Sequence, residues 1–170
     1  MLEVFKVAVE ELTPETFAPF GQVISTFDQA KPPVRVGALD EREYKVTAAV
    51  VDPANPTLAE GWQRGHFACH DDAGQSFYPS LHCPSIFFVA PVQQTLEPED
   101  LRAFYSEGQL GICMGLEVWH TMPICLKGTE LYQTARGNQD YHAHSLDVRF
   151  DQDRGLTLEP DMAHFGGWTE

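Results

Sequence analysis

One histidine, His120, stands in the middle of an alternating apolar segment. If Leu116–Leu126 forms a β-strand, every second side chain shares a face with His120, and these are Leu116, Val118, Met122, Ile124 and Leu126. We expect that face to be buried, and a buried imidazole without a hydrogen-bond partner or a metal costs about 1–3 kcal/mol. The pattern therefore predicts either a satisfied core histidine or a ligand or proton carrier in an internal pocket.

The spacing of the other histidines indicates which of them could bind one metal ion together. These histidines are His66, His70, His82, His142, His144 and His164. On an extended strand, His66 and His70 lie about 13 Å apart, so they do not easily bind one metal ion. His142 and His144 lie about 6.6 Å apart on one face of the expected strand Tyr141–Phe150, and they could share a metal. The alternative is that this pair, near the start of a strand, is half exposed and inert.

The segment HDDAGQ resembles the first motif of cupin barrels, in which His-x-His is followed by three or four residues and then Glu. His70 and Gln75 occupy the second histidine and the glutamate positions, Ala68 occupies the first, and His120 matches the histidine of the second cupin motif. A metal site of His70, Gln75 and His120 would combine two imidazoles with a neutral amide, a weak ligand set for a divalent ion. We name no certain cofactor and keep a divalent metal ion on these three residues as the alternative.

Two arginines are candidates for binding a substrate carboxylate. A guanidinium group binds a carboxylate through two parallel hydrogen bonds, and Arg102 and Arg136 both lie in predicted strands or at their ends. An arginine at the surface or on an edge strand is the alternative for each. Glu117 is close to His120 in sequence but points to the opposite face of an ideal strand, unless a β-bulge redirects it.

The charge balance narrows the class of partner. The 170 residues contain 11 Lys and Arg against 25 Asp and Glu, a net charge of −14. This sign disfavours binding to nucleic acids and to anionic membrane surfaces, while a small acidic substrate would need a locally positive pocket. The sequence contains no G-x-S-x-G elbow, Walker loop, G-x-G-x-x-G or H-E-x-x-H motif, which favours an activity without a nucleotide cofactor.

Turn residues and short apolar runs predict the elements that position these groups. Thr13-Pro14-Glu15 has the form of a helix start, with Thr13 as N-cap. Short strands are expected at 22–26, 44–51, 62–69, 75–81, 86–92, 101–105, 111–113, 117–126, 130–135 and 141–150, most of them bounded by Gly, Pro, Asp or Asn. This pattern predicts an all-β sandwich or barrel with one short N-terminal helix, in a single domain spanning residues 1–170.

Cysteine usage and the N-terminal segment bear on the compartment. The four cysteines have no metal-binding spacing and lie in or beside apolar stretches, so we expect buried, reduced thiols. The N-terminal segment lacks the apolar core of a secretory signal, and no apolar run approaches 18 residues. We therefore expect a cytoplasmic protein without a membrane segment.

Several segments, in order, resemble the ureidoglycolate lyase family. They are FAPFGQVI near the N-terminus, HDDAGQSFYP, LRAF, EGQLG, and VWH followed by Pro123. Arg136-Gly137-Asn138 with Asp140 corresponds more loosely to the late Arg-Gly region of the family. The resemblance covers most of the chain, and it implies a cupin-like β-barrel, that is, a double-stranded β-helix or jelly roll.

The resemblance also implies a reaction. Members of the family split ureidoglycolate into urea and glyoxylate, a step of allantoin degradation in purine catabolism, and they are homodimers. Breaking this carbon–nitrogen bond needs a base for the hydroxyl proton and an acid for the departing nitrogen, and histidine suits both tasks. By this resemblance the catalytic residues are His120, His70 and Gln75, and the substrate-binding residues are Arg102, Trp119 and Glu117.

This chain departs from the family pattern at several positions. Ala68 and Gly115 stand where polar or charged side chains are usual, and Met114 replaces an aromatic residue. Thr121 and Met122 separate Trp119-His120 from the proline that usually follows it closely. These departures predict weak turnover of ureidoglycolate itself and a preference for a bulkier or less polar acid. Two alternatives remain open: a metal-dependent cupin isomerase, dehydratase or oxygenase acting on a small acid, and a non-catalytic cupin that binds a small acid or a sugar.

Overall fold

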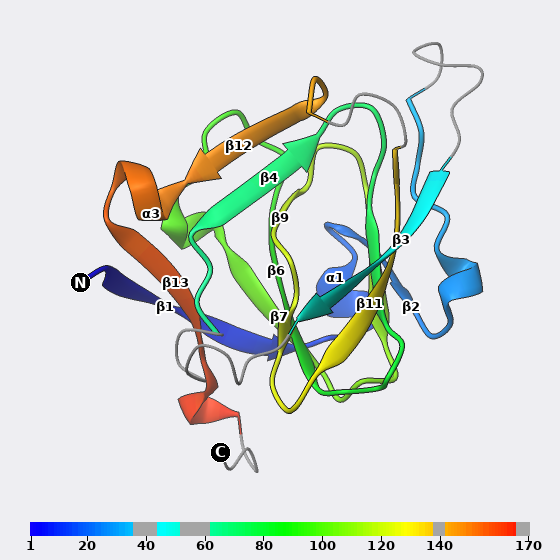
Figure 1. Cartoon of the computed structure of the whole chain (residues 1–170), viewed down its shortest axis with the longest axis horizontal. Helices are drawn as coiled ribbons and strands as arrows, with labels where there is room; N and C mark the ends of the chain where they lie inside the picture. The colour runs from blue at the N-terminus through cyan, green and yellow to red at the C-terminus, as the bar shows by residue number, and fades with distance from the viewer. Residues whose placement is uncertain (36–43, 52–61, 138–141, 166–170) are drawn as a thin grey trace.

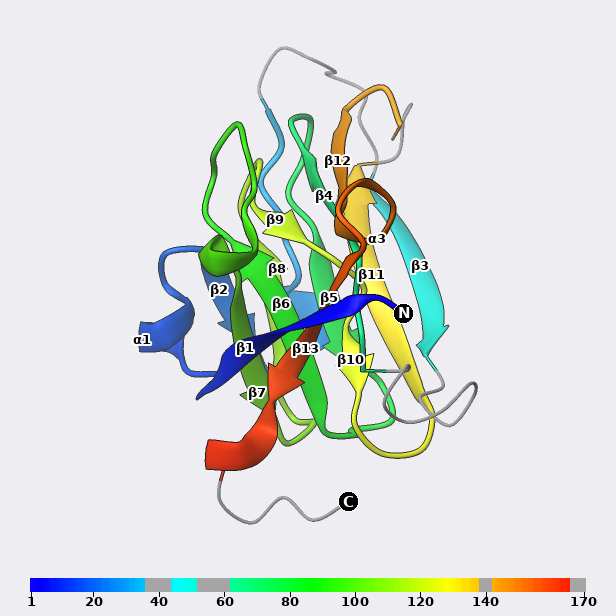
Figure 2. The same cartoon turned by 90° about the vertical axis from the view of Figure 1, so that its left-hand side faces the viewer.

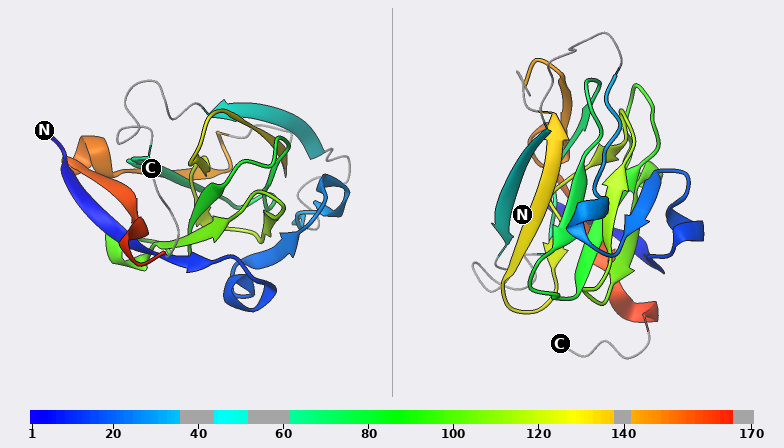
Figure 3. Two further views of the ribbon diagram at one scale, coloured as in Figure 1. Left: turned by 90° about the horizontal axis from the view of Figure 1, so that it is seen from below. Right: turned by 90° about the vertical axis from the view of Figure 1, so that its right-hand side faces the viewer.

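The structure is a computed structural model in which most of the described chain is β-strand (Figure 1). It describes residues 1–35, 44–51, 62–137 and 142–165, with the backbone alone for 44–51. The strands form two sheets that curl toward each other, as the view from below makes plain (Figure 3, left). The all-β, cupin-like fold predicted from the sequence is confirmed.

The larger sheet has the strand order β12-β4-β9-β6-β7-β1-β13, with β10 also paired to β6. Its strands are β1 (Glu3–Glu11), β4 (His66–His70), β6 (Ser85–Ala90), β7 (Arg102–Ser106), β9 (Trp119–His120), β10 (Ile124–Cys125), β12 (Ser145–Arg149) and β13 (Leu156–Asp161). The smaller sheet has the order β2-β8-β5-β11-β3. Its strands are β2 (Gly21–Ile24), β3 (Tyr44–Val51), β5 (Ser76–Pro79), β8 (Gly111–Met114) and β11 (Glu130–Gly137).

Strand β6 is buried on both faces, which explains its unbroken apolar sequence SIFFVA. Phe87 and Val89 point into the core between the two sheets. Phe88 and Ala90 point to the opposite side, where a second core lies against β1, β13 and the short helix α3 (Phe150–Asp153). Apolar packing on both faces therefore fixes β6. β9 and β7 pair with β6 and are held in place through it.

The predicted N-terminal helix is confirmed as α1 (Pro14–Phe17). The Thr13 side chain accepts a hydrogen bond from the Thr16 backbone N–H, and the Thr16 hydroxyl in turn accepts one from the Thr13 N–H. This reciprocal capping satisfies N–H groups that a four-residue helix cannot pair internally. Phe17 then anchors the helix in the core between the sheets.

Strands at the two ends of the described chain were missed from the sequence. β1 pairs in parallel with both β13 and β7 (Figure 2). The local sequence does not distinguish these strands from exposed segments. In β1, for example, Glu3, Glu10 and Glu11 stand among the apolar residues. Pairing with distant strands, rather than local pattern, forms this edge of the sheet.

Two predicted strands are shorter in the structure. Instead of one strand over Leu116–Leu126, only β9 and β10 form, and Met122 between them is exposed. Glu117 has φ = 60°, a left-handed conformation that interrupts extended backbone just before β9. The predicted strand Tyr141–Phe150 begins only at Ser145, because residues 142–144 form a turn.

A buried carboxylate joins β11 to the turn between β5 and β6. Glu130 has no exposed surface, and its two oxygens accept hydrogen bonds from the backbone N–H groups of Leu81, Cys83 and Leu131 at 2.7–2.8 Å. Each bond satisfies a donor that the turn leaves without a strand partner. The ionised side chain thereby fixes the start of β11, the strand that carries Arg136 to the other end.

All four cysteines are free thiols, three of them buried, as predicted from their apolar surroundings. Within the described parts of the chain, no helix is both long and apolar enough to span a membrane.

Candidate active site

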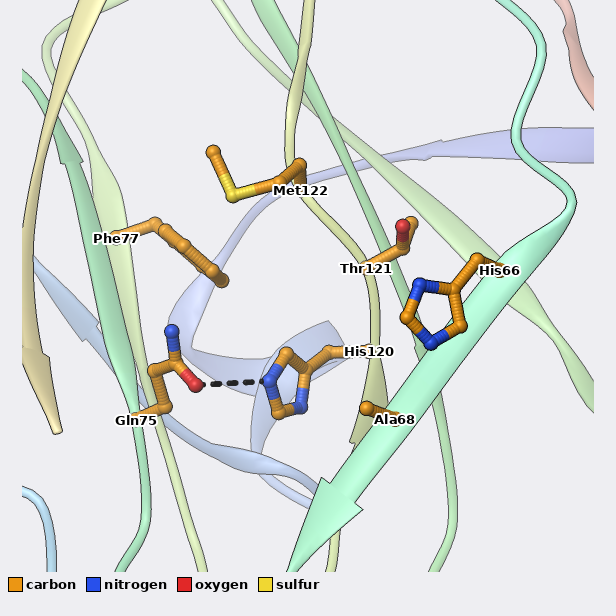
Figure 4. Close-up of a pocket in the computed structure, with 7 residues that line it drawn as sticks. All are labelled: His66, Ala68, Gln75, Phe77, His120, Thr121 and Met122. Atoms are coloured by element: carbon orange, nitrogen blue, oxygen red, sulfur yellow. Dashed lines mark hydrogen bonds between the residues drawn. The ribbon is translucent and has the colours of Figure 1, made fainter. Parts of the chain in front are cut away.

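His120 lies at the centre of a pocket between the two sheets (Figure 4). The pocket, called here the His120 pocket, is lined by His66, Ala68, Gln75, Phe77, His120, Thr121 and Met122. In the large sheet His120 pairs with Ala68 on one side and with Val89 on the other, so its position depends on both neighbouring strands. We predict from the sequence that His120 shares one small interior pocket with His70 and Gln75; Gln75 lines the pocket with His120, whereas His70 is not among the lining residues.

Both nitrogens of His120 are engaged. Nδ1 lies 2.9 Å from the Val118 carbonyl oxygen and Nε2 lies 3.0 Å from Gln75 Oε1. A carbonyl only accepts, so Nδ1 carries a hydrogen and, in the neutral ring, the lone pair is on Nε2. The Oε1 contact suits the protonated ring, whereas the same amide turned by 180° donates N–H to the neutral ring. Gln75 can therefore satisfy either protonation state of His120.

His70 is the second buried imidazole of the site. Its ring lies 5.0 Å from the His120 ring, measured between centroids, and its Nδ1 is 2.7 Å from the Ser145 hydroxyl. Alternation along β4 places His66, Ala68 and His70 on one face. Phe67 points to the other face and packs in the second core, which lies against β1, β13 and α3. Two strands, β4 and β9, thus bring together two histidines that are 50 residues apart.

Burial keeps both rings neutral near pH 7. Loss of solvation lowers the pKa of His70 to about 3, assisted by the nearby charges of His120 and Arg136 and opposed by a hydrogen bond to Gln75. Loss of solvation also lowers the pKa of His120 to about 4, although the Val118 carbonyl favours the protonated form. Because each ring disfavours a charge on its neighbour, the pair does not readily hold two protons.

Arg136 is the positive group that acts on this pair. It lies near the end of β11, whose pairing with β5 runs antiparallel toward Gln75. Its positive charge is one of the causes that lower the pKa of His70. At the next residue, Gly137, a Cβ would lie 2.3 Å from Asp72 Oδ2, so only glycine permits this close approach.

Arg102, predicted to bind a substrate carboxylate, already holds one from the protein. Its Nε and Nη2 donate to the two oxygens of Glu10 at 2.7 and 2.6 Å, and the guanidinium lies over the rings of Phe20 and Phe104. It does not line the His120 pocket. Its predicted role stays a prediction, and a substrate would have to displace Glu10.

Trp119 and Glu117, also predicted to bind substrate, are placed elsewhere. Trp119 faces away from His120 into the second core, against β1, β13 and α3, and its indole N–H donates to the Gln93 carbonyl. Glu117 pairs with Arg35 and lines a different pocket with Cys69 and Asp71. The Glu117 backbone N–H nevertheless donates to the His70 carbonyl at 2.9 Å, and this bond joins the segment before β9 to the end of β4.

His142 and His144 do not form a pair on a strand face, contrary to the prediction for Tyr141–Phe150. Both lie in the turn that precedes β12, where His142 is exposed. His144 is 2.8 Å from Asp71 and lines the pocket that contains Glu117. The sequence signal failed because a two-residue spacing places side chains on one face only if the backbone is extended.

The residues of the site do not make a strong metal centre. Within the described residues, no group of three or more His, Cys, Asp or Glu side chains could hold a metal ion. The predicted set of His70, Gln75 and His120 supplies two imidazoles and a neutral amide, and one nitrogen of each ring is already hydrogen-bonded within the protein. We derive no step through a metal.

His66 is the pocket residue that sequence reasoning did not assign to the site. It was considered only as a metal partner of His70 along one strand. The structure places it beside His120, as a diagonal neighbour across the β4–β9 pair. The spacing of alternate residues on β4 could have found it, since residues 66, 68 and 70 share a face.

Among the positions where the chain departs from the family pattern, Ala68, Thr121 and Met122 line the His120 pocket. Ala68 stands directly opposite His120. Gly115 borders a separate pocket with Gly21 and Cys113, and Met114 is buried in the core between the sheets. The predicted effect of Gly115 on the polar contacts of the site is therefore not supported by its position. Asn138 and Asp140 lie outside the described residues.

Comparison with known proteins gives a consistent result. The family profile described as ureidoglycolate lyase matches residues 65–153, the segment that carries His66, His70, Gln75 and His120. A ureidoglycolate lyase of Pseudomonas savastanoi pv. phaseolicola is 30% identical over 124 residues, covering 68% of this chain and 73% of that protein. One from Stutzerimonas stutzeri is 30% identical over 167 residues, covering 92% and 96%. One from Pseudomonas aeruginosa PAO1 is 25% identical over 166 residues, covering 89% and 95%.

Proposed function

Because the chain belongs to the ureidoglycolate lyase family, we propose that it is a lyase that cleaves the carbon–nitrogen bond of ureidoglycolate, releasing urea and glyoxylate. The observation that carries the proposal is the His120 pocket, in which Gln75 meets His120 and the His70 ring lies 5.0 Å from that of His120. His120 can accept a proton and Gln75 can hold an amide.

His120 is the proposed base. Its Nδ1–H is fixed by the Val118 carbonyl, which directs the lone pair of the neutral ring to Nε2. The pKa of about 4 makes this a weak base in the empty pocket. A substrate that brings its own carboxylate into the pocket adds a negative charge, which raises the pKa of a neighbouring imidazole. The substrate thereby activates the base that takes its hydroxyl proton.

Gln75 is proposed to hold the ureido group. An amide side chain offers one acceptor and two donors, and a ureido group presents the complementary carbonyl and N–H groups. Gln75 lies just before β5, and its own carbonyl accepts a hydrogen bond from the Met114 N–H at 2.7 Å. This bond fixes the backbone so that the side chain is aimed at His120.

His70 is proposed to position the substrate. Its hydrogen bond to Ser145 orients the ring, and the adjacent His120 disfavours a second positive charge. We assign the carboxylate of the substrate to Arg136 rather than to Arg102, because Arg136 acts on His70 whereas Arg102 is held by Glu10. A substrate carboxylate bound to Arg136 also neutralises the positive charge by which Arg136 disfavours protonation of the neighbouring histidine.

The test is the release of urea and glyoxylate from racemic ureidoglycolate by the purified protein. We expect His120→Ala to lower kcat by about 10²–10⁴-fold, as general acid–base groups do, while circular dichroism shows an unchanged fold. His144→Ala is the matched control, because His144 lies outside the His120 pocket, and it should retain wild-type turnover. A folded His120→Ala variant with full activity would remove His120 from the mechanism.

Ala68 supports the prediction that turnover of ureidoglycolate is weak. It lies opposite His120, where a polar side chain could reach the substrate but a methyl group cannot bond to it. A buried polar group left unpaired costs about 1–3 kcal/mol, or about 10–100-fold in rate or affinity. We expect Ala68→Asp to raise kcat/KM for ureidoglycolate. Ordinary enzymatic turnover by the wild type, about 1–10³ s⁻¹, would show that the departure is neutral.

We propose a homodimer in solution, as the resemblance to the family implies. The described part of the larger sheet ends at β12, a strand paired only with β4, and a second chain could cover such an edge. Light scattering at micromolar concentrations should give twice the mass of one chain. A single-chain mass across that range would refute the dimer.

The proposed activity belongs to allantoin degradation in purine catabolism, in the cytoplasm. Fractionation of cells that express the chain should recover it with cytoplasmic markers, and recovery with secreted proteins would contradict the location.

A further inference from the structure

A second histidine, His66, lines the His120 pocket and has a carboxylate partner. Its Nε2 lies 2.6 Å from Asp147 Oδ1, and β12 pairs with β4 so that Asp147 stands opposite Ala68. Figure 4 shows the His66 ring extending from β4 toward Thr121. Among the described residues, its other nitrogen, Nδ1, has no hydrogen-bond partner within the protein and remains able to bond to a molecule in the pocket.

The surroundings of His66 differ from those of the two buried histidines. The His66 side chain is 46% exposed. Asp147 accepts a hydrogen bond from Nε2, so a carboxylate orients the ring. The other charged neighbours are Arg149, which stands opposite His66 on β12 and is exposed, and Asp151, which lies against Gly65. The two carboxylates outnumber the single guanidinium.

The two buried histidines are shielded from water. His70 and His120 are 3% and 5% exposed, and burial lowers their pKa values to about 3 and 4. Near pH 7 they are neutral, so they can accept a proton but hold none to give to a leaving group. Cleavage of a carbon–nitrogen bond requires that donor, because an unprotonated urea nitrogen is a poor leaving group.

We propose that the His66–Asp147 pair supplies the general acid of the lyase reaction. This inference rests on the proposed function. The proton of the substrate hydroxyl passes to His120, and the O–H electron pair forms the carbonyl of glyoxylate. The carbon–nitrogen bond breaks with its electron pair on nitrogen, and Nδ1 of the protonated His66 gives that nitrogen a proton. His120 then loses a proton to water and His66 regains one, so the cycle needs no other reactant.

Asp147 is a positioning residue in this scheme. It does not line the His120 pocket but holds Nε2, which leaves Nδ1 as the nitrogen that faces the pocket. The two residues are 81 positions apart and come together only through the pairing of β4 with β12. The arrangement follows the general logic of an imidazole oriented by a carboxylate.

The test compares His66→Gln and Asp147→Asn with the wild type, using racemic ureidoglycolate at several pH values. We expect His66→Gln to lower kcat at least 100-fold with KM changed less than about threefold, since the lost interaction acts in the transition state. The pH profile of kcat should differ between the wild type and His66→Gln, because the variant lacks the proposed proton donor. Asp147→Asn should reduce kcat less severely than His66→Gln.

His144→Gln is the matched control, because His144 is also a half-exposed histidine paired with an aspartate, Asp71, but it lines a different pocket. It should keep the wild-type kcat and pH profile. Circular dichroism and thermal unfolding establish that each variant is folded, and His66→Asn replaces His66→Gln if the latter is not. If the wild type is active and the His66 variant has the same kcat and the same pH profile, this inference alone is overturned. A wild type that releases no urea would overturn the proposed function as well.

Discussion

Acidification should destabilise this protein through the two buried histidines of the site. In an unfolded chain, histidine has a pKa near 6.5. In the folded chain, burial lowers the pKa of His120 to about 4 and that of His70 to about 3. As the pH falls below 6.5 the unfolded chain binds protons that the folded chain does not, so the free energy of unfolding decreases. The decrease ends only when the pH falls below the folded-state pKa values.

The size of the effect follows from these values. Between pH 7 and pH 5, a histidine with a pKa of 6.5 unfolded and about 4 or lower folded contributes a loss of about 2 kcal/mol. Two such rings together give about 4 kcal/mol, a large part of the 5–15 kcal/mol typical of a folded domain. Proton uptake by the unfolded chain thus removes a large part of the stability of an ordinary domain under mildly acidic conditions.

Urea unfolding followed by tryptophan fluorescence at the two pH values measures this loss. We expect His120→Leu to lose about 2 kcal/mol less than the wild type between pH 7 and pH 5, whatever its stability at pH 7. Phe77→Leu is the control, because Phe77 packs beside His120 with ring centroids 6.0 Å apart but does not titrate. It should lower stability equally at both values. Equal pH dependence in His120→Leu and the wild type would refute the reasoning.

Three further predictions concern the framework of the site. Glu130→Gln should lower the free energy of unfolding by about 1–3 kcal/mol in urea titrations, because it weakens the carboxylate that accepts three backbone N–H groups, and an unchanged midpoint would contradict this. Gly137→Ala should cost about 1–3 kcal/mol because its Cβ would meet Asp72, and the cost should shrink in an Asp72→Ala background; additive effects would disprove the contact. Glu117→Gly should raise the melting temperature by relieving a positive φ, corresponding to about 1 kcal/mol, and a lower melting temperature would show that its pairing with Arg35 outweighs the strain.

Local sequence signals predicted the elements whose cause is local. The N-cap of α1 was readable because Thr13 and Pro14 act on the turn that follows them. The apolar run in β6 predicted a buried strand because alternate residues face two cores. The inward position of His120 was predicted correctly, but from a strand of eleven residues, of which only Trp119–His120 and Ile124–Cys125 are paired.

The partners of the catalytic groups were decided by tertiary structure. Gln75 meets His120 across 45 residues, and His66 meets Asp147 across 81. Arg102 was a reasonable carboxylate ligand by residue type, yet Glu10, 92 residues away, occupies its guanidinium. Such pairs depend on strand order and register, which a single sequence does not encode in any one segment.

The sequence by itself determined the fold class, the family and the histidines from which a proton-transfer site could be built. Periodicity of two, turn residues and a helix cap act over a few positions, so they can be read along the chain. Only the tertiary structure decided which histidine is buried and neutral and which retains a carboxylate and solvent. That distinction arises because burial and charge pairing depend on every strand packed around a side chain, not on its neighbours in sequence.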